Sequence, residues 1–163
     1  MRADIIERTA EVWTEAPDRA RSAPTVVATS EESQAIIEAG AFTWRTDLPE
    51  GLGGSNAAAS PTALLLGALA GCAVVFVRDV LGPQLGIGVD AVSAKVSCET
   101  DARGLLGFEG VVQHLEAMRV EVEVSSPDGH DAVAKIAQVW KERCPIFLAL
   151  TKPTPVDVVF RNA

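Results

Sequence analysis

The sequence predicts an α+β fold, because a long apolar helix, a pair of alternating strands and an amphipathic helix follow one another along its 163 residues. The long helix is expected over Ser60–Gly82: a Ser can cap its start, Pro61 suits its first position, and Gly82-Pro83 predicts its end. Every residue from Ala63 to Val77 is apolar or Gly, which predicts a helix buried on all sides. A small sheet covers only one side, so a second subunit is the simplest cover for the other.

Composition limits the classes of partner. A net charge of −8 disfavours nucleic acids and anionic membrane surfaces, because both attract Lys and Arg. The length suits a single domain, residues 1–163, with one sizeable core. The apolar run is shorter than the roughly 18 residues of a membrane span, and Arg78 and Asp79 end it, so no membrane span is expected.

Cysteine usage and the N-terminal residues indicate a reducing compartment. Three cysteines in a chain of this length are not a disulfide scaffold. The sequence contains no CxxC motif or Cys/His cluster, and we expect neither a metal nor another cofactor. The first residues, MRADIIERTAEVW, lack the uninterrupted apolar core of a signal peptide. We therefore expect a cytoplasmic protein whose thiols are normally reduced.

Three strands are expected before the long helix, over Asp4–Trp13, Thr25–Thr29 and Ala41–Thr46. The intervening segment Ser30–Gly40 is either a short capped helix or a pair of strands joined by a polar bend. Leu48–Ala59 is rich in Gly and is expected to form a close turn beside the helix. A phosphate-binding loop is not expected there, because the segment has no Lys and no βαβ context.

Strand and helix patterns continue after the long helix. Gly88–Thr100 alternates apolar and polar residues, which places Cys98 on the core-facing side as an inert thiol. Met118–Ser125 alternates in the same way and is expected to pair with that strand. His130–Arg143 has the pattern of an amphipathic helix, and Pro155–Arg161 is expected to close the fold as a last strand.

Two of the three thiols fall on core-facing positions of predicted helices. Cys72 lies in the middle of the apolar helix, and Cys144 continues the apolar stripe of the amphipathic helix. Pro145 ends that helix and begins a short apolar one, Ile146–Leu150, whose first N–H groups favour an anionic sulfur. This pattern suggests a pair that cycles between dithiol and disulfide. Two unrelated core cysteines are the alternative that these residues leave open.

Several short motifs, taken together and in order, resemble those of one known family. A Gly-Gly pair at residues 53–54 precedes a Ser-Pro step at residues 60–61 and an apolar helix containing LLLGALAGC. RGLLG follows at residues 103–107, and a later helix runs into ERCPI at residues 142–146. This arrangement resembles the OsmC/Ohr family over roughly residues 43–160.

The resemblance implies both a fold and an activity. Members of this family are intertwined homodimers in which curved antiparallel sheets wrap around two long central helices. They are cysteine-based peroxidases that reduce organic hydroperoxides in the response to oxidative stress, with an external dithiol as reductant. By resemblance, Cys72 is the peroxidatic cysteine, Cys144 is the resolving cysteine that forms a disulfide with it, and Arg45 stabilises the thiolate.

One position departs from the family pattern. OsmC and Ohr proteins usually carry a Glu just after the Asn-Pro step, which orients the Arg, whereas this chain has Thr62 and Ala63 there. Either another acid such as Glu50 or Asp47 does that work, or the Arg is held differently, or activity is lost. The alternative function is a non-catalytic OsmC-like protein that binds an apolar small molecule, or senses oxidants, in a pocket at the dimer interface. A structural or interaction subunit is a third possibility.

Overall fold

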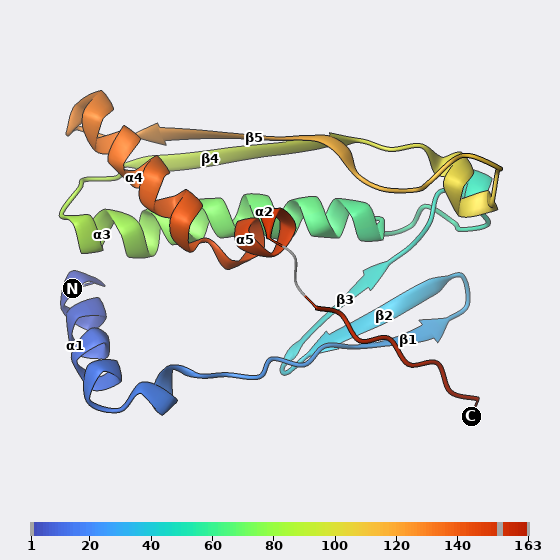
Figure 1. Cartoon of the computed structure of the whole chain (residues 1–163), viewed down its shortest axis with the longest axis horizontal. Helices are drawn as coiled ribbons and strands as arrows, with labels where there is room; N and C mark the ends of the chain where they lie inside the picture. Colours follow the sequence, from blue (N-terminus) through green and yellow to red (C-terminus); the bar gives the residue numbers. More distant parts are fainter. Residues whose placement is uncertain (1, 153–154, 163) are drawn as a thin grey trace.

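The computed structural model describes residues 2–152 and 155–162. Its helices and strands are α1 (Arg2–Glu15), β1 (Val27–Glu31), β2 (Gln34–Ala39), β3 (Phe42–Thr46), α2 (Pro61–Phe76), α3 (Gly82–Leu85), β4 (Ala91–Glu99), β5 (Glu116–Ser125), α4 (Gly129–Arg143) and α5 (Pro145–Thr151). The β4–β5 hairpin covers one side of α2, α5 lies against α2, and β1, β2 and β3 form a separate sheet (Figure 1). The predicted α+β class is confirmed.

The core forms where two apolar stripes meet. The fully buried side chains of each stripe recur at every fourth residue, which keeps them on one face of a helix. They are Leu69, Ala73, Val77 and Leu81 along α2 and its continuation, and Ile136, Trp140 and Cys144 along α4 and its end. Half-buried valines from the inner face of the β4–β5 hairpin pack against this core.

The start of α2 is as predicted, but its end is not. The Ser60 hydroxyl accepts a hydrogen bond from the N–H of Ala63 at 3.2 Å, and Pro61 occupies the first turn. The helix does not stop at Gly82-Pro83, because a π-helical turn over Val77–Leu81 joins α2 to α3. The wider turn accommodates the Pro83 ring, which in a regular α-helix would clash with the carbonyl group four residues earlier. The helical run ends instead at Gly86, which has a φ of +66°.

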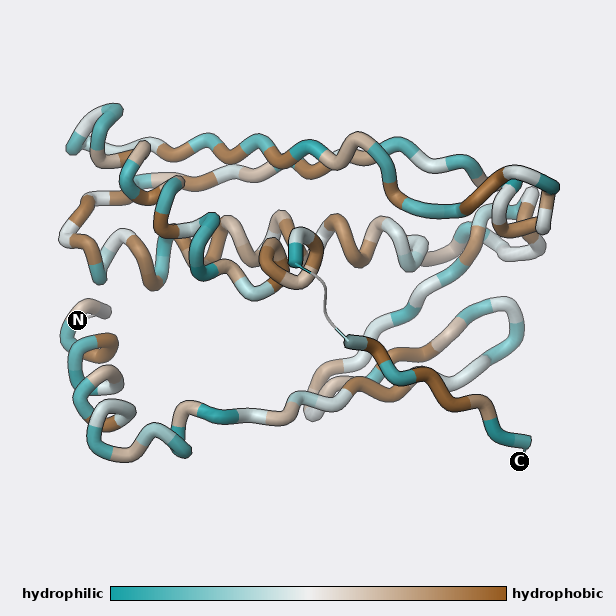
Figure 2. Tube along the Cα trace, in the orientation of Figure 1, coloured by the Kyte–Doolittle hydropathy of each residue, from teal (hydrophilic) through white to brown (hydrophobic). Residues whose placement is uncertain are grey.

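Within a single chain, the apolar helix is buried along one stripe rather than on all sides. Leu65 is 37% exposed and Val75 is 50% exposed. The continuous run Pro61–Leu85 has 25 residues, and by length and composition alone it could cross a membrane, so the expectation that the run is too short was wrong. Only 22% of its most apolar window is buried inside the chain, although one face packs as the core of a folded domain. Figure 2 shows this helix as hydrophobic along most of its length.

The predicted antiparallel pairing of the two alternating strands is confirmed. Val96 lies opposite Val120, and the apolar side chains of both strands alternate toward α2. The register shifts between Ser97 and Glu99, so Cys98 sits at a bulge and is half-buried on the inner side.

The N-terminal segment predicted as a strand over Asp4–Trp13 is a helix, α1, which packs against α3 and the π-helical turn. Its half-buried side chains are Ala3, Ile6 and Thr9, a spacing of three that suits a helical face and not a strand. Charged residues between them occupy the solvent side. The pattern of apolar residues that suggested an imperfect strand therefore belongs to a helix.

Of the two structures expected for Ser30–Gly40, a short helix or a pair of strands joined by a bend, the structure has the pair of strands. β1 and β2 pair antiparallel across a tight turn in which Glu32 has a φ of +54°. The second predicted strand, Thr25–Thr29, begins two residues too early, because β1 is Val27–Glu31. β3 matches the third predicted strand to within one residue and pairs with β2.

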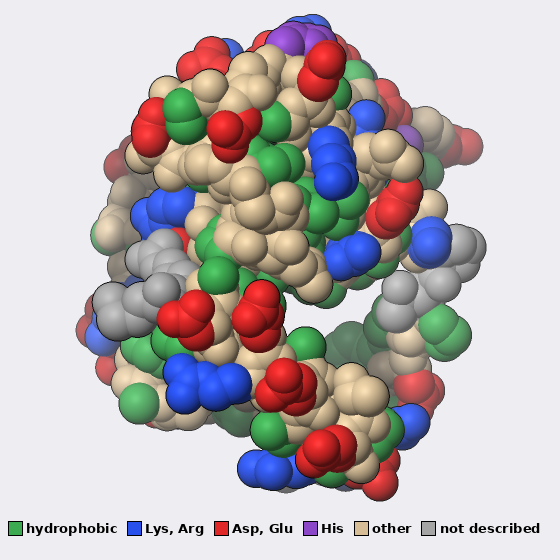
Figure 3. Space-filling view, turned by 90° about the vertical axis from the view of Figure 1, so that its left-hand side faces the viewer, with side chains coloured by type: hydrophobic (Ala, Val, Ile, Leu, Met, Phe, Trp, Pro, Cys, Tyr) green, Lys and Arg blue, Asp and Glu red, His purple; other side chains and the backbone are tan. Residues whose placement is uncertain are grey.

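The expected closing strand Pro155–Arg161 is absent from the described residues, in which residues 155–162 have no regular secondary structure. Among the described residues, no strand pairs with this segment, which is drawn without an arrow in Figure 1. Its apolar side chains remain in solvent: Val156 is 77% exposed and Phe160 is 96% exposed. Seen from one end, acidic and basic side chains are interspersed on the surface, and hydrophobic side chains are visible in the gap between the two halves of the molecule (Figure 3).

Because Ile136 lies in the core where the two apolar stripes meet, Ile136→Ala is expected to destabilise the fold strongly. Ile136 is 1% exposed and contributes to the core from α4, so its truncation leaves a cavity and should lower the free energy of unfolding by about 2–5 kcal/mol. Urea unfolding measures this change. Lys135→Ala, at an exposed position on the same helix, is the control and should change it by less than about 0.5 kcal/mol. Equal effects of the two substitutions would contradict this core.

Candidate functional site

The two predicted redox cysteines lie side by side although 72 residues separate them in sequence. The Sγ atoms of Cys72 and Cys144 are 3.1 Å apart, and both residues are free thiols. Cys144 is fully buried, whereas Cys72 is partly exposed. An S–S bond is about 2.05 Å long, so only a small movement separates this dithiol from a disulfide.

The junction of α4 and α5 fixes the position of Cys144. Its backbone is extended, with φ −67° and ψ 114°, as residues before proline prefer. Its N–H donates to the Trp140 carbonyl at 2.8 Å, which is the last hydrogen bond of α4. Its carbonyl accepts from the Leu148 N–H at 2.9 Å, which is the first hydrogen bond of α5. The rings of Trp140 in α4 and Phe147 in α5 pack against each other across the junction, with centroids 5.1 Å apart. The side chain of Cys144 thereby faces α2.

The surroundings of Cys72 favour the neutral thiol. Burial raises the pKa of Cys72 to about 11, and the hydrogen bond and charge of Cys144 act in the same direction. The backbone N–H of Ile146, in the first turn of α5, acts in the opposite direction. The sequence predicted that the first N–H groups of the helix after Pro145 favour an anionic sulfur near Cys144. In the structure, the N–H of Ile146 at the start of α5 acts on the sulfur of Cys72. Because the pKa lies above neutrality, a reactive thiolate at neutral pH requires a further positive charge near this sulfur.

Arg45 lies on β3 and its described contacts are within its own sheet. It forms an ion pair with Glu31 of β1 and donates to Oε1 of Gln34 at 3.1 Å. Among the described residues no hydrogen bond joins it to either sulfur. Sequence reasoning missed Glu31 as its acidic partner, because Glu31 and Arg45 meet only through the register of the three strands.

Asp47, one of the two acids considered as a partner of Arg45, organises the glycine-rich loop instead. It is 3% exposed and accepts hydrogen bonds from the Ser55 hydroxyl at 2.6 Å, the Leu48 N–H at 2.7 Å and the Ala57 N–H at 2.9 Å. These donors, Ser55 first, hold the pKa of this carboxyl well below its usual range. Glu50, the other candidate, lies in a short 3₁₀ turn and has no described bond to Arg45.

The loop is a close turn beside the helix, as expected. A Cβ atom on Gly54 would lie 1.9 Å from the carbonyl oxygen of Leu48, so only glycine fits there. The Thr46 hydroxyl donates to the Ala59 carbonyl at 2.7 Å, which ties the end of β3 to the residue before the helix cap. The loop thus links the β1–β3 sheet firmly to the start of α2.

Apolar cavities lie beside α4 and at the start of α2. An apolar cavity of about 370 Å³ between β5 and α4 is lined by Trp140 and Phe147 beside the Cys144 junction. Another, of about 580 Å³, lies at the start of α2, with Leu48, Leu65 and Leu105 in its wall.

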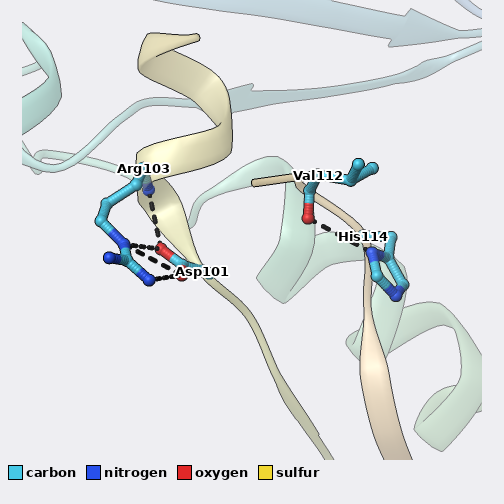
Figure 4. Close-up of polar contacts among 4 residues, drawn as sticks. All are labelled: Asp101, Arg103, Val112 and His114. Carbon is cyan, nitrogen blue, oxygen red and sulfur yellow. Dashed lines mark hydrogen bonds and ion pairs between the residues drawn. The ribbon is translucent and has the colours of Figure 1, made fainter. Parts of the chain in front are cut away.

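The RGLLG segment borders a polar hollow. Arg103 pairs with Asp101, and Nδ1 of His114 lies 3.2 Å from the Val112 carbonyl (Figure 4). His114 also contacts Glu116 at 2.9 Å. Among the described residues, no group of three or more His, Cys, Asp or Glu side chains could hold a metal ion.

An α+β fold with two adjacent thiols on its central helices defines a candidate dithiol protein. The family model for OsmC-like proteins matches residues 53–159, and the chain belongs to this family. The match includes both cysteines and excludes α1 and the β1–β3 sheet. No curated protein sequence matches the chain significantly.

Solved structures share the fold at low identity. An OsmC-like protein from Mycoplasma pneumoniae aligns with a TM-score of 0.65 at 20% identity, covering 80% of this chain and 89% of that one. An organic hydroperoxide resistance protein OsmC from Legionella pneumophila aligns with a TM-score of 0.58 at 17% identity, covering 80% and 90%. The organic hydroperoxide resistance protein OhrB of Bacillus subtilis aligns with a TM-score of 0.53 at 16% identity, covering 80% and 92%.

The geometry predicts that mild oxidation joins Cys72 to Cys144. One equivalent of diamide should remove two thiols from the reduced protein and lower its intact mass by two hydrogen atoms, because the sulfurs are 3.1 Å apart. Peptide mapping after alkylation should find Cys98 alkylated. Cys98→Ser should behave like wild type, and Cys144→Ser should form no intramolecular bond. A disulfide that includes Cys98 would contradict the geometry.

Proposed function

We propose that this protein is a cysteine-based peroxidase that reduces organic hydroperoxides. The observation that carries the proposal is the 3.1 Å separation of the Cys72 and Cys144 sulfurs at the junction of three helices. Membership of the OsmC-like family and the fold shared with organic hydroperoxide resistance proteins support it.

Cys72 is the proposed peroxidatic residue because it is the more accessible of the two thiols. Its thiolate attacks one oxygen of the hydroperoxide, so that an S–O bond forms as the O–O bond breaks. The alkoxide that leaves takes up a proton and departs as the alcohol, while the sulfur is oxidised to a sulfenic acid. Apolar surroundings suit the organic part of such a substrate.

Cys144 is the proposed resolving residue. Its sulfur attacks the sulfenic sulfur, an S–S bond forms, and the hydroxyl group leaves as water after taking up a proton. An external dithiol then reduces the disulfide by exchange and restores both thiols. A reducing compartment such as the cytoplasm supplies dithiols of this kind.

A second copy of the chain is the proposed source of the missing positive charge. Burial raises the pKa of Cys72 to about 11, and Arg45 of the same chain is bonded within its own sheet. The chain also leaves apolar side chains uncovered on several elements, including Phe42 at 74% and Val75 at 50% exposed. A homodimer that covers these surfaces and brings Arg45 of one subunit to Cys72 of the other would meet both needs.

The alternative function is a non-catalytic binder of an apolar small molecule, or a sensor of oxidants, within the same dimer. The raised pKa of Cys72 favours this reading, because a neutral thiol reacts slowly with peroxides. The apolar cavities beside the helices offer room for a ligand.

Peroxide consumption separates the two functions. With cumene hydroperoxide and dithiothreitol, Cys72→Ser should reduce turnover to the uncatalysed background, because the attacking sulfur is lost. Cys144→Ser should accumulate a sulfenic acid on Cys72 that dimedone traps, or be overoxidised, and Cys98→Ser should retain the wild-type rate. Equally slow consumption by wild type and Cys72→Ser would overturn the peroxidase. A native mass spectrum with a retained apolar ligand and unreactive thiols would support the binder.

A further inference from the structure

Three strands bring a set of polar side chains together around Arg45. Because alternate residues of a strand share a face, Arg45 shares its face of the sheet with Gln34 on β2 and Glu31 on β1. Glu31 lies directly opposite Gln34 in the register. Arg45 lies opposite Ile36, one diagonal step from Gln34, which is within reach of a long side chain.

The guanidinium group of Arg45 is held from two strands through a single nitrogen. Its Nη1 makes the ion pair with Glu31 and donates to Oε1 of Gln34 at 3.1 Å. No described residue accepts a hydrogen bond from Nε or Nη2. An Arg side chain has five N–H donors in a planar fork, so this arrangement fixes the plane of the group and leaves one edge of it free to donate.

The second holder, Gln34, is itself fixed. Its Nε2 lies 3.5 Å from Oδ2 of Asp47, while its Oε1 accepts from Arg45. The buried Asp47 in turn binds the backbone of the loop that leads into α2. The side chains around Arg45 are thus connected to the start of the helix that carries Cys72.

We propose that Glu31 is a positioning residue for Arg45: its carboxylate orients the guanidinium so that the free edge can meet the reacting sulfur or the peroxide oxygens. This inference rests on the proposed peroxidase function. Glu31 itself touches no reacting atom. Its side chain is 47% exposed and that of Arg45 is 48% exposed, so the ion pair contributes little to stability and its loss should leave the fold intact.

Glu38 provides a matched control. It is an exposed Glu on the same face of the sheet, opposite Thr43 and also one diagonal step from Arg45, but no described hydrogen bond or ion pair joins it to Arg45. Glu38→Gln therefore removes the same charge from the same face of the sheet without removing the proposed contact.

A double-mutant cycle tests the proposal. The second-order rate constant for cumene hydroperoxide is measured for wild type, Glu31→Gln, Arg45→Met and the double variant, with thermal unfolding of each as a check of folding. Glu31→Gln should lower the rate constant at least about tenfold, since misorientation of a catalytic group can cost up to about a hundredfold. In the Arg45→Met background, Glu31→Gln should have no further effect. Glu38→Gln should behave like wild type.

The possible failures are distinguishable. If Arg45→Met keeps the wild-type rate constant, the use of Arg45 in the proposed function is wrong. If Arg45→Met is slow but Glu31→Gln is as fast as wild type, only the positioning role of Glu31 is overturned. Equal losses from Glu31→Gln in both backgrounds would also overturn it, because Glu31 would then act independently of Arg45. Gln34→Ala gives a second test and should likewise slow the reaction only when Arg45 is present.

Discussion

The packing of the α2 stripe against the α4 stripe determines where both thiols lie. Val77 and Leu81 of the first stripe and Ile136 of the second are almost completely buried where α4 packs against the π-helical turn, and Cys144 is the last residue of the second stripe. Pro145 ends α4 and begins α5, so Cys144 lies at the junction of the two helices. Its sulfur there faces that of Cys72 at 3.1 Å. The same burial that brings the sulfurs together also makes Cys72 a poor nucleophile, because it raises the pKa of this thiol to about 11.

For the proposed peroxidase, this conflict would leave the single chain without the positive charge that its thiolate needs. The strongest positive candidate, Arg45, is held by Glu31 and Gln34 on a sheet that is separate from the β4–β5 hairpin. The chain also leaves apolar side chains of α2, β3 and the C-terminal segment exposed to solvent. We propose that a second copy of the chain covers these apolar surfaces and contributes the guanidinium group of its Arg45. The glycine-rich loop, whose backbone is held by Asp47, connects the β1–β3 sheet to the start of α2.

Features encoded by local pattern could be predicted from the sequence, whereas features that depend on distant pairing could not. The capped start of α2, the β4–β5 hairpin and the break at Cys144-Pro145 each have a signal within a few residues. The helix over residues 4–13 was not predicted because its half-buried face, Ala3, Ile6 and Thr9, includes a polar residue, and several of its apolar residues are exposed. The segment 155–161 has the composition of a strand but no described strand to pair with. Glu31 could not be assigned to Arg45 without the register, which a single sequence does not reveal.

Subunit mixing tests most directly whether two copies of the chain complete one site. Arg45→Met and Cys72→Ser proteins are each inactive in this account, but a mixed dimer would contain one site with both Cys72 and Arg45. The two variants are mixed in equal amounts, dissociated and allowed to reassociate. Half of the resulting dimers should be mixed, and each mixed dimer has one intact site of two, so the mixture should recover about a quarter of the wild-type peroxidase rate. Activity that stays at the level of the separate variants would contradict a site shared between subunits.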